Sequence, residues 1–239
     1  MRGAMLYGPR DLRFEERETP TIIKPTDAIV RMSATCVCGS DLWPYRGISP
    51  VPQPTPMGHE YCGIVEEAGR AVTSIKPGQF VIGSFFASDN TCPNCRAGYQ
   101  SGCQRRELVR GAQASLLRVP LADGTLVATP DVPSDDLIPS LLTLSDVMGT
   151  GWFAADAASV KPGMTVAVVG DGAVGLLGVL MGVPPAASSA LRLRAQQRLD
   201  RAALVHRAVA FRYLNQRESK IEDLAGMDLF RPNQIDELR

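Results

Sequence analysis

Short apolar runs rich in β-branched residues alternate with glycine and proline over the first 130 residues. The segments 27–38 (DAIVRMSATCVC), 58–69 (GHEYCGIVEEAG) and 76–86 (KPGQFVIGSFF) each have the composition of a strand next to a turn. Segment 115–130 predicts two further short strands on either side of an Asp-Gly turn at 123–124. This pattern predicts a mainly β domain, folded as a partly open barrel.

The pattern changes to helical spacing near Asp135. Residues 133–158 begin with a Ser-Asp-Asp cluster typical of a helix start, and their apolar residues then recur three or four apart, which predicts one helix. Next come a predicted turn, a predicted buried strand at Val166–Val169 and the first turns of a helix. After Val183, the run PPAASS breaks this helix, and the arginine-rich remainder predicts a helical or disordered tail with one weakly apolar stripe.

Composition places the chain among globular proteins. Of its 239 residues, 45% are hydrophobic and 21% charged, which suffices for a hydrophobic core. Lys+Arg and Asp+Glu both total 25, so no net charge favours nucleic acid or an anionic membrane as a partner. The sequence shows no secretory leader and no apolar run of the roughly 20 residues that a membrane span needs. We therefore expect a cytoplasmic protein with reduced thiols.

The loop 88–103 (SDNTCPNCRAGYQSGC) carries a metal-binding pattern. Cys92 and Cys95 form a Cys-x-x-Cys knuckle, and Cys103 follows within the same loop. Structural zinc takes four ligands, and the carboxylate of Asp89 can supply the fourth. The pattern predicts a zinc site formed by these four residues. A reduced surface knuckle without metal remains an alternative; a redox pair fits less well, because such motifs open a helix after a strand.

Two further segments of the β region each contribute one metal-ligating side chain. Cys38 is followed by Ser40 and Asp41, and His59 is followed by Glu60. A catalytic zinc is usually held by three protein groups, with the fourth position left for water or substrate. Taken singly, the histidine could equally be a satisfied structural residue and the cysteine a small core residue.

Together these motifs resemble the zinc-dependent medium-chain alcohol dehydrogenases, which join a GroES-like β domain to a Rossmann cofactor domain. The resemblance runs from about residue 1 to residue 180, and in the 88–103 loop Asp89 stands where the family usually has a cysteine. The other residues that carry it are Cys38-Gly39-Ser40-Asp41, Gly58-His59-Glu60, Gly63, Gly69 and Val72.

The resemblance implies two zinc ions and a role for each residue of the second group. Cys38, His59 and Asp146 would bind the catalytic zinc, with Glu60 beside it, and Ser40 would pass a proton from the alcohol. The implied reaction is hydride transfer between a small alcohol, or its aldehyde or ketone, and NAD or NADP, in a homo-oligomer. Many relatives end the proton relay with a histidine where this chain has Trp43, which cannot shuttle a proton, so a relay must leave by another route. Cys36 and Cys62 fit no ligand pattern and are expected in the core.

Gly170, Gly172 and Gly175 form G-x-G-x-x-G directly after the predicted strand, which is the spacing of a dinucleotide-binding turn. We therefore expect a zinc-binding domain at 1–150, the start of an incomplete Rossmann domain at 151–182, and a tail at 183–239 that is not family-like. Read one base out of frame, GC-rich Ala-Ala codons would encode Pro-Pro, and Gln-Leu-Gly codons would encode Ser-Ser. The run PPAASS therefore suggests a frameshift, or a junction with foreign coding sequence, near residue 181.

Two alternatives to an active dehydrogenase stay open. One is a zinc-binding GroES-like remnant without dehydrogenase activity. The other is a partner-binding module whose arginine-rich tail helix contacts an acidic partner or a membrane surface.

Overall fold

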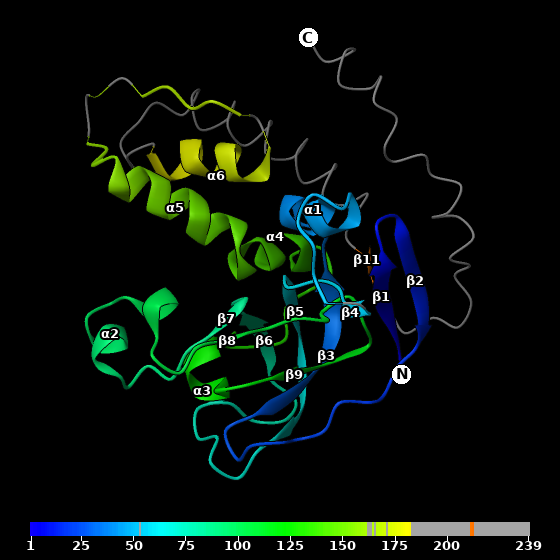
Figure 1. The fold of residues 1–239 in the computed structure, drawn as a ribbon. Helices are drawn as coiled ribbons and strands as arrows, with labels where there is room; N and C mark the ends of the chain where they lie inside the picture. The colour runs from blue at the N-terminus through cyan, green and yellow to red at the C-terminus, as the bar shows by residue number, and fades with distance from the viewer. Residues whose placement is uncertain (53, 162–163, 165, 171, 183–210, 213–239) are drawn as a thin grey trace.

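The computed structural model describes residues 1–52, 54–161, 164, 166–170, 172–182 and 211–212 (Figure 1). Antiparallel strands dominate the first 130 residues, as the sequence predicted, and they form three sheets. The order in the main sheet is β10-β6-β5-β3-β11, with β9 also paired to β3, and the smaller sheets are β2-β1-β4 and β7-β8. The strands are β1 (Arg2–Gly8), β2 (Asp11–Glu16), β3 (Ala28–Thr35), β4 (Thr55–Pro56), β5 (Tyr61–Ala68), β6 (Phe80–Gly83), β7 (Phe86–Ala87), β8 (Glu107–Leu108), β9 (Leu116–Val119), β10 (Leu126–Ala128) and β11 (Phe211–Arg212).

Short helices connect these strands, and longer ones follow them. α1 and the turn before it lie between β3 and β4, α2 lies in the cysteine loop, and α5 and α6 lie side by side above the sheets (Figure 1). The helices are α1 (Leu42–Tyr45), α2 (Pro93–Arg96), α3 (Ala122–Thr125), α4 (Ile138–Leu142), α5 (Val147–Ala157) and α6 (Ala173–Gly182), with 3₁₀ turns at Gly39–Asp41, Gln100–Gly102 and Thr143–Ser145.

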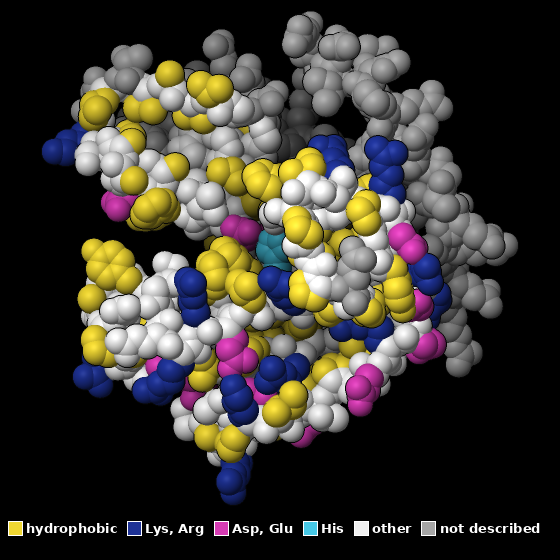
Figure 2. Space-filling view, in the orientation of Figure 1, with side chains coloured by type: hydrophobic (Ala, Val, Ile, Leu, Met, Phe, Trp, Pro, Cys, Tyr) yellow, Lys and Arg dark blue, Asp and Glu magenta, His cyan; other side chains and the backbone are white. Residues whose placement is uncertain are grey.

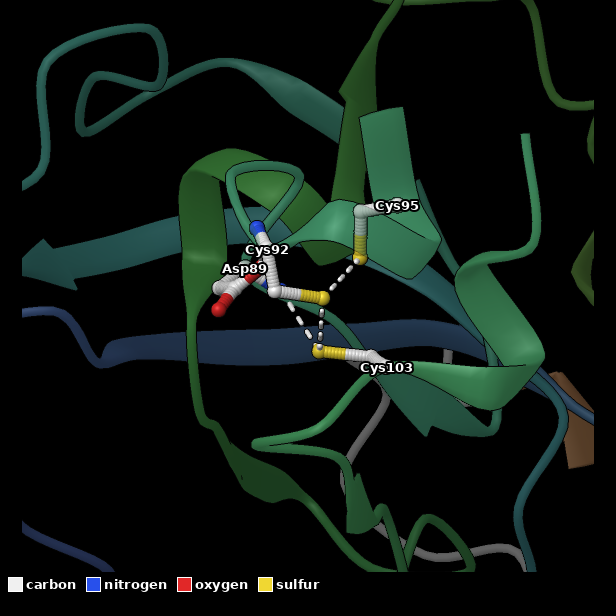
Figure 3. A group of neighbouring side chains, drawn as sticks. All are labelled: Asp89, Cys92, Cys95 and Cys103. Carbon is white, nitrogen blue, oxygen red and sulfur yellow. Dashed lines mark hydrogen bonds between the residues drawn. The ribbon is translucent and has the colours of Figure 1, made fainter. Parts of the chain in front are cut away.

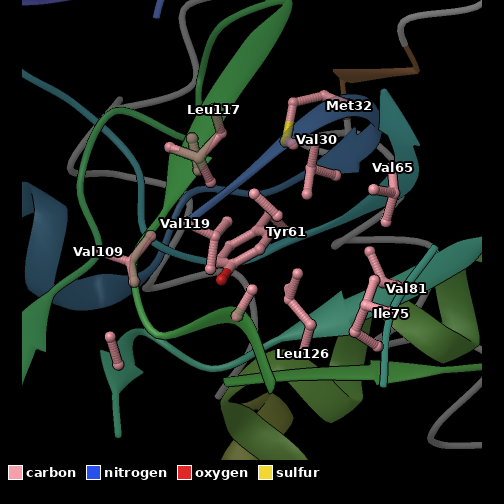
Figure 4. Close-up of a cluster of buried hydrophobic side chains, with 14 residues drawn as sticks. Val30, Met32, Tyr61, Val65, Ile75, Val81, Val109, Leu117, Val119 and Leu126 are labelled. Atoms are coloured by element: carbon pink, nitrogen blue, oxygen red, sulfur yellow. The ribbon is translucent and has the colours of Figure 1, made fainter. Parts of the chain in front are cut away.

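The core lies between β3, β5, β6 and β9, around the fully buried ring of Tyr61 (Figure 4). Val30, Val65 and Val81 pack there from three different strands, each almost completely removed from solvent. Full burial of each of these side chains contributes about 1.5–3 kcal/mol to the free energy of folding. This core therefore holds β3 and β5, beside whose ends Cys38, His59 and Glu60 lie.

The helix predicted at 133–158 is interrupted in the structure. α4 ends at Leu142, a 3₁₀ turn follows, and α5 begins at Val147 after Asp146, whose backbone is not helical (φ −149°, ψ −67°). The interruption has a tertiary cause. The buried Ser145 hydroxyl donates to the carbonyl of Gly83 at 2.6 Å and accepts from the amide of Tyr61 at 3.0 Å, which fixes the chain to two strands.

The strand predicted at Val166–Val169 is not formed in the described residues. Val166 and Val168 are about half exposed, and Val169 is 99% exposed. A strand exists through hydrogen bonds to a neighbour, and no described strand pairs with this segment. The helix that was predicted to follow is present as α6.

The expectations for 183–239 lie outside the described residues, apart from Phe211 and Arg212. These two pair with Thr35 and Ala34 as β11, which the helical pattern did not predict. No helix in the described ranges is long and apolar enough to cross a membrane.

A buried ion pair fixes the start of β3, and it gives a first prediction. Asp27 is fully buried, and its Oδ2 accepts from Arg118 Nη1 at 2.7 Å and from the amide of Lys24 at 2.8 Å. We expect Asp27→Ala to lower the free energy of unfolding by about 3 kcal/mol, because it removes the closer of the two carboxylates that pair with the partly buried guanidinium of Arg118.

Urea unfolding measures this change. Asp11→Ala is the matched control, because the Asp11–Arg13 pair is exposed and its loss should shift the urea midpoint very little. Equal shifts for the two variants would contradict the role assigned to the Asp27 pair.

Candidate metal centres

The fold brings Cys38, His59, Glu60 and Asp146 together. Each offers one ligand atom, and these four atoms all lie within 4.8 Å of one another. Cys38 follows β3, while His59 and Glu60 immediately precede β5. Because β3 and β5 are antiparallel and Thr35 pairs with Tyr61, the two segments meet at the same end of the ladder. Figure 2 shows histidine and acidic side chains together at the inner end of a hollow on this face.

Asp41 orients two of these groups. Its Oδ1 lies 3.2 Å from Nδ1 of His59, and its Oδ2 accepts from the amide of Cys38 at 2.9 Å. The other ring nitrogen of His59, Nε2, lies 3.6 Å from Oδ2 of Asp146 and so faces the cluster. A carboxylate on the far nitrogen is the usual way in which a metal-binding histidine is oriented. Sequence reasoning noted Asp41 only as a nearby polar residue, because the spacing from Cys38 does not reveal a contact with His59.

Asp146 reaches the site because the helix is broken before it. Ser145 is fixed to the strands, and Asp146 is the residue immediately before α5. From this position the side chain of Asp146 points toward His59. Its Oδ1 accepts from Thr150 Oγ1 at 2.9 Å, so one oxygen is held by its own helix and the other faces the cluster.

The charges of this group favour a bound cation. Glu60 is only 1% exposed, and neither of its carboxylate oxygens has a hydrogen-bond partner in the described residues. Burial raises the pKa of Glu60. Burial by itself lowers the pKa of His59. Hydrogen bonds with Asp146, Asp41 and Cys38 outweigh this effect and raise the pKa to about 12. A buried carboxylate without partners is costly, and a divalent cation among these donors would compensate it. The donor set therefore fits zinc.

A second group lies in the cysteine loop, where Asp89, Cys92, Cys95 and Cys103 point toward one another (Figure 3). The sulfur of Cys92 lies 3.5 Å from that of Cys95 and 4.0 Å from that of Cys103, and no disulfide links them. Three nearly buried free thiols so close together are the donor set of a structural zinc site.

Backbone amides support anionic ligands in this loop. The amides of Asp89 and Arg105 lie 3.5 Å and 3.4 Å from the sulfur of Cys103, and hydrogen bonds from the backbone at Gln104 and Cys95 lower the pKa of Cys92. Burial raises the pKa of Cys95 to about 12.

Asp89 has two roles in this geometry. Its Oδ1 accepts from the amides of Cys92 and Thr91 at 3.0 Å and 2.9 Å, and these bonds lower its pKa. Its Oδ2 lies 3.3 Å from Nε of Arg105. The carboxylate thus shapes the knuckle through its hydrogen bonds and also offers an oxygen to the thiol group.

The other predicted site residues, Ser40 and the three glycines of the turn, also lie in the described part of the chain. Gly170 has a positive φ of 110°, and a Cβ on Gly175 would lie 2.0 Å from the carbonyl oxygen of Gly170. A glycine at this point in α6 is therefore required for the helix to approach the turn. Ser40 is exposed in the 3₁₀ turn after Cys38. Cys36 and Cys62 are buried beside Phe80, as expected of core residues.

Comparison with known proteins agrees with this architecture. Residues 24–133 match the family model described as alcohol dehydrogenase GroES-like domain. The chain is 38% identical over 192 residues to the medium chain reductase/dehydrogenase ucsI of Acremonium sp, covering 75% of this chain and 65% of the relative. It is 36% identical over 191 residues to zinc-type alcohol dehydrogenase B of Aspergillus flavus, covering 75% and 44%. The chain is thus a relative of the zinc-type medium-chain alcohol dehydrogenases.

Solved structures of alcohol dehydrogenases share the fold. The zinc dependent alcohol dehydrogenase 2 from Streptococcus pneumonia is 34% identical with a TM-score of 0.71, covering 83% of this chain and 59% of that one. Alcohol dehydrogenase TADH from Thermus sp. ATN1 is 29% identical with a TM-score of 0.72, covering 83% and 61%. The chain thus spans between 44% and 65% of the length of these relatives.

Proposed function

We propose that this chain carries the zinc-binding part of an oxidoreductase that transfers hydride between a small alcohol, or the corresponding aldehyde or ketone, and NAD or NADP. The observation that carries the proposal is the meeting of Cys38, His59, Glu60 and Asp146 within 4.8 Å, from three segments far apart in sequence. Cys38, His59 and Asp146 would hold the catalytic zinc, and Asp89, Cys92, Cys95 and Cys103 a structural zinc.

Zinc at the first site supplies Lewis-acid polarisation of an alcohol or carbonyl oxygen. The chain's own residues set the conditions for this chemistry. Asp41 holds the ring of His59 with Nε2 toward the site, and Thr150 holds Asp146. Ser40, exposed in the turn beside Cys38, is proposed to take the proton of the alcohol. The indole of Trp43 is a donor only, so the proton leaves Ser40 by another route.

We further propose residues 1–150 as the metal-binding domain and residues 151–182 as the beginning of the cofactor domain. The turn with Gly170, Gly172 and Gly175 would receive the pyrophosphate of NAD or NADP. The proposal is supported by the close approach of α6 to Gly170 at Gly175.

Two measurements test the function together. Elemental analysis of the purified chain is expected to find close to two zinc ions per chain, and titration with NADH followed by nicotinamide fluorescence is expected to saturate. A zinc content near zero would overturn the proposal.

One observation favours a second candidate, a zinc-binding domain without hydride transfer. The segment Val166–Val169 leads into the glycine turn, yet it pairs with no described strand. Two zinc ions without saturable NADH binding would select this candidate over the dehydrogenase.

A variant of the glycine turn tests the cofactor site by itself. We expect Gly175→Ala to weaken NADH binding about tenfold or more, because its Cβ would collide with the Gly170 carbonyl and push α6 away. Gly178→Ala on the same helix is the matched control, since its Cβ would meet its nearest neighbour at an ordinary 3.8 Å. Equal NADH affinity in the two variants would argue against a cofactor site at this turn.

A further inference from the structure

Glu60 differs from His59 and Asp146 in how it is held. His59 is fixed by Asp41 and Asp146 by Thr150, so both are held in orientations that face the site. The carboxylate of Glu60 is buried, and neither oxygen has a hydrogen-bond partner in the described residues. A zinc that binds substrate needs one position free of protein ligands. Glu60 is therefore the donor that can turn away from the metal without breaking a bond that positions it.

When a buried carboxylate turns away from a metal, it contacts neither the metal nor solvent. It then needs a hydrogen-bond donor from the protein, because a buried charge without a partner is costly. Cys36 is placed to provide one. Thr35 pairs with Tyr61 at the end of the β3–β5 ladder, and the Thr35 hydroxyl donates to the carbonyl of Glu60 at 2.8 Å. Continuing this register by one residue places Cys36 opposite Glu60, and directly opposed side chains on antiparallel strands are neighbours.

The properties of Cys36 suit a neutral donor. It is 1% exposed, and its carbonyl accepts from Nε2 of Gln113 at 3.3 Å, which fixes its backbone. A thiol is neutral at ordinary pH, and a buried site favours the neutral form. An S–H group is a weak donor, so it can stabilise the carboxylate without competing strongly with a metal.

We propose that Cys36 is a positioning residue that donates a hydrogen bond to Glu60 when this carboxylate is turned away from the metal, and so keeps the fourth position open for substrate. The inference rests on the proposed zinc site at Cys38, His59 and Asp146. It gives Cys36 a role beyond that of the core residue that its sequence context suggested.

The rate of zinc release tests this role without reference to catalysis. Zinc-loaded chain is mixed with an excess of a chromogenic chelator, and the phase that is absent in Cys38→Ala is assigned to this site. We expect Cys36→Ala to slow that phase about three- to tenfold, because Glu60 then spends more time bound to the metal. Cys36→Ser, which keeps a donor, is expected to restore the wild-type rate.

Two controls separate a specific role from a general loss of packing. Cys62→Ala removes the other thiol of the same core cluster and should leave the release rate unchanged. In Glu60→Gln, adding Cys36→Ala should have no further effect. The proposal is overturned if Cys36→Ala releases zinc as fast as the wild type, or if Cys36→Ser or Cys62→Ala behaves like Cys36→Ala.

The failure of the zinc site has a different signature. If the wild-type chain shows no release phase that depends on Cys38, the proposed catalytic metal site is wrong and the role of Cys36 falls with it. A Cys38-dependent phase that is indifferent to Cys36 would overturn the role of Cys36 alone.

Discussion

Replacing His59 with alanine is expected to remove one of the two zinc ions and to lower alcohol oxidation by more than about a thousandfold. His59 supplies the imidazole that faces Asp146 across the first site. Polarisation of the substrate oxygen by a metal is worth several kcal/mol of transition-state stabilisation, and about 4 kcal/mol corresponds to a thousandfold in rate. Elemental analysis and initial rates with NAD and NADP measure the two effects.

His206→Ala is the matched control, because His206 is the chain's other histidine and lies outside the described residues. It should keep both zinc ions. Zinc affinity in Asp41→Asn should lie between those of His59→Ala and His206→Ala. We expect it to be about 10–100-fold weaker than in the wild type, since Asp41 orients the ring of His59 without binding the metal. Retention of two zinc ions in His59→Ala would contradict the ligand assignment.

Replacing Cys95 with alanine is expected to remove the other zinc ion and to lower the thermal unfolding midpoint by roughly 5–10 °C. The three thiols are buried against one another in a small cluster of their own. Binding that requires the folded loop stabilises the folded state. Calorimetry with and without a chelator measures the shift.

Two substitutions of Asp89 serve as the comparison for the Cys95→Ala prediction. Asp89→Cys should keep the metal, because a thiolate replaces a carboxylate at the same position, whereas Asp89→Ala should bind it more weakly. A chelator should lower the midpoint of the wild type but not that of Cys95→Ala. Unchanged midpoints in both would show that the loop holds no structural zinc.

Local spacing carried much of the prediction. A Cys-x-x-Cys knuckle brings two thiols together through the backbone between them, so Cys92 and Cys95 could be paired without a structure, and Cys103 added from the same short loop. The strands β3, β5, β6, β9 and β10 followed in the same way from apolar, β-branched composition and neighbouring turn residues, whereas β1 and β2 were not predicted. The family followed from several such local patterns in order along the chain.

Cross-strand placement could not be predicted in this way. The contact of Asp41 with His59 depends on the register of β3 against β5, and a shift of one residue would turn these side chains apart. Continued by one residue, the same register places Cys36 opposite Glu60. No spacing within either segment contains this information.

The helix break at Asp146 shows the limit most clearly. The apolar spacing from 133 to 158 favours one continuous helix, although Ser145 and Asp146 are residue types preferred at a helix start. The chain leaves the helix because Ser145 bonds to Gly83 and Tyr61, residues more than sixty positions away. The amino-acid order thus specifies which donors this protein has and which lie together within a loop. Hydrogen bonds and packing between distant segments bring Asp146 to His59, because that contact exists only once the sheet has formed.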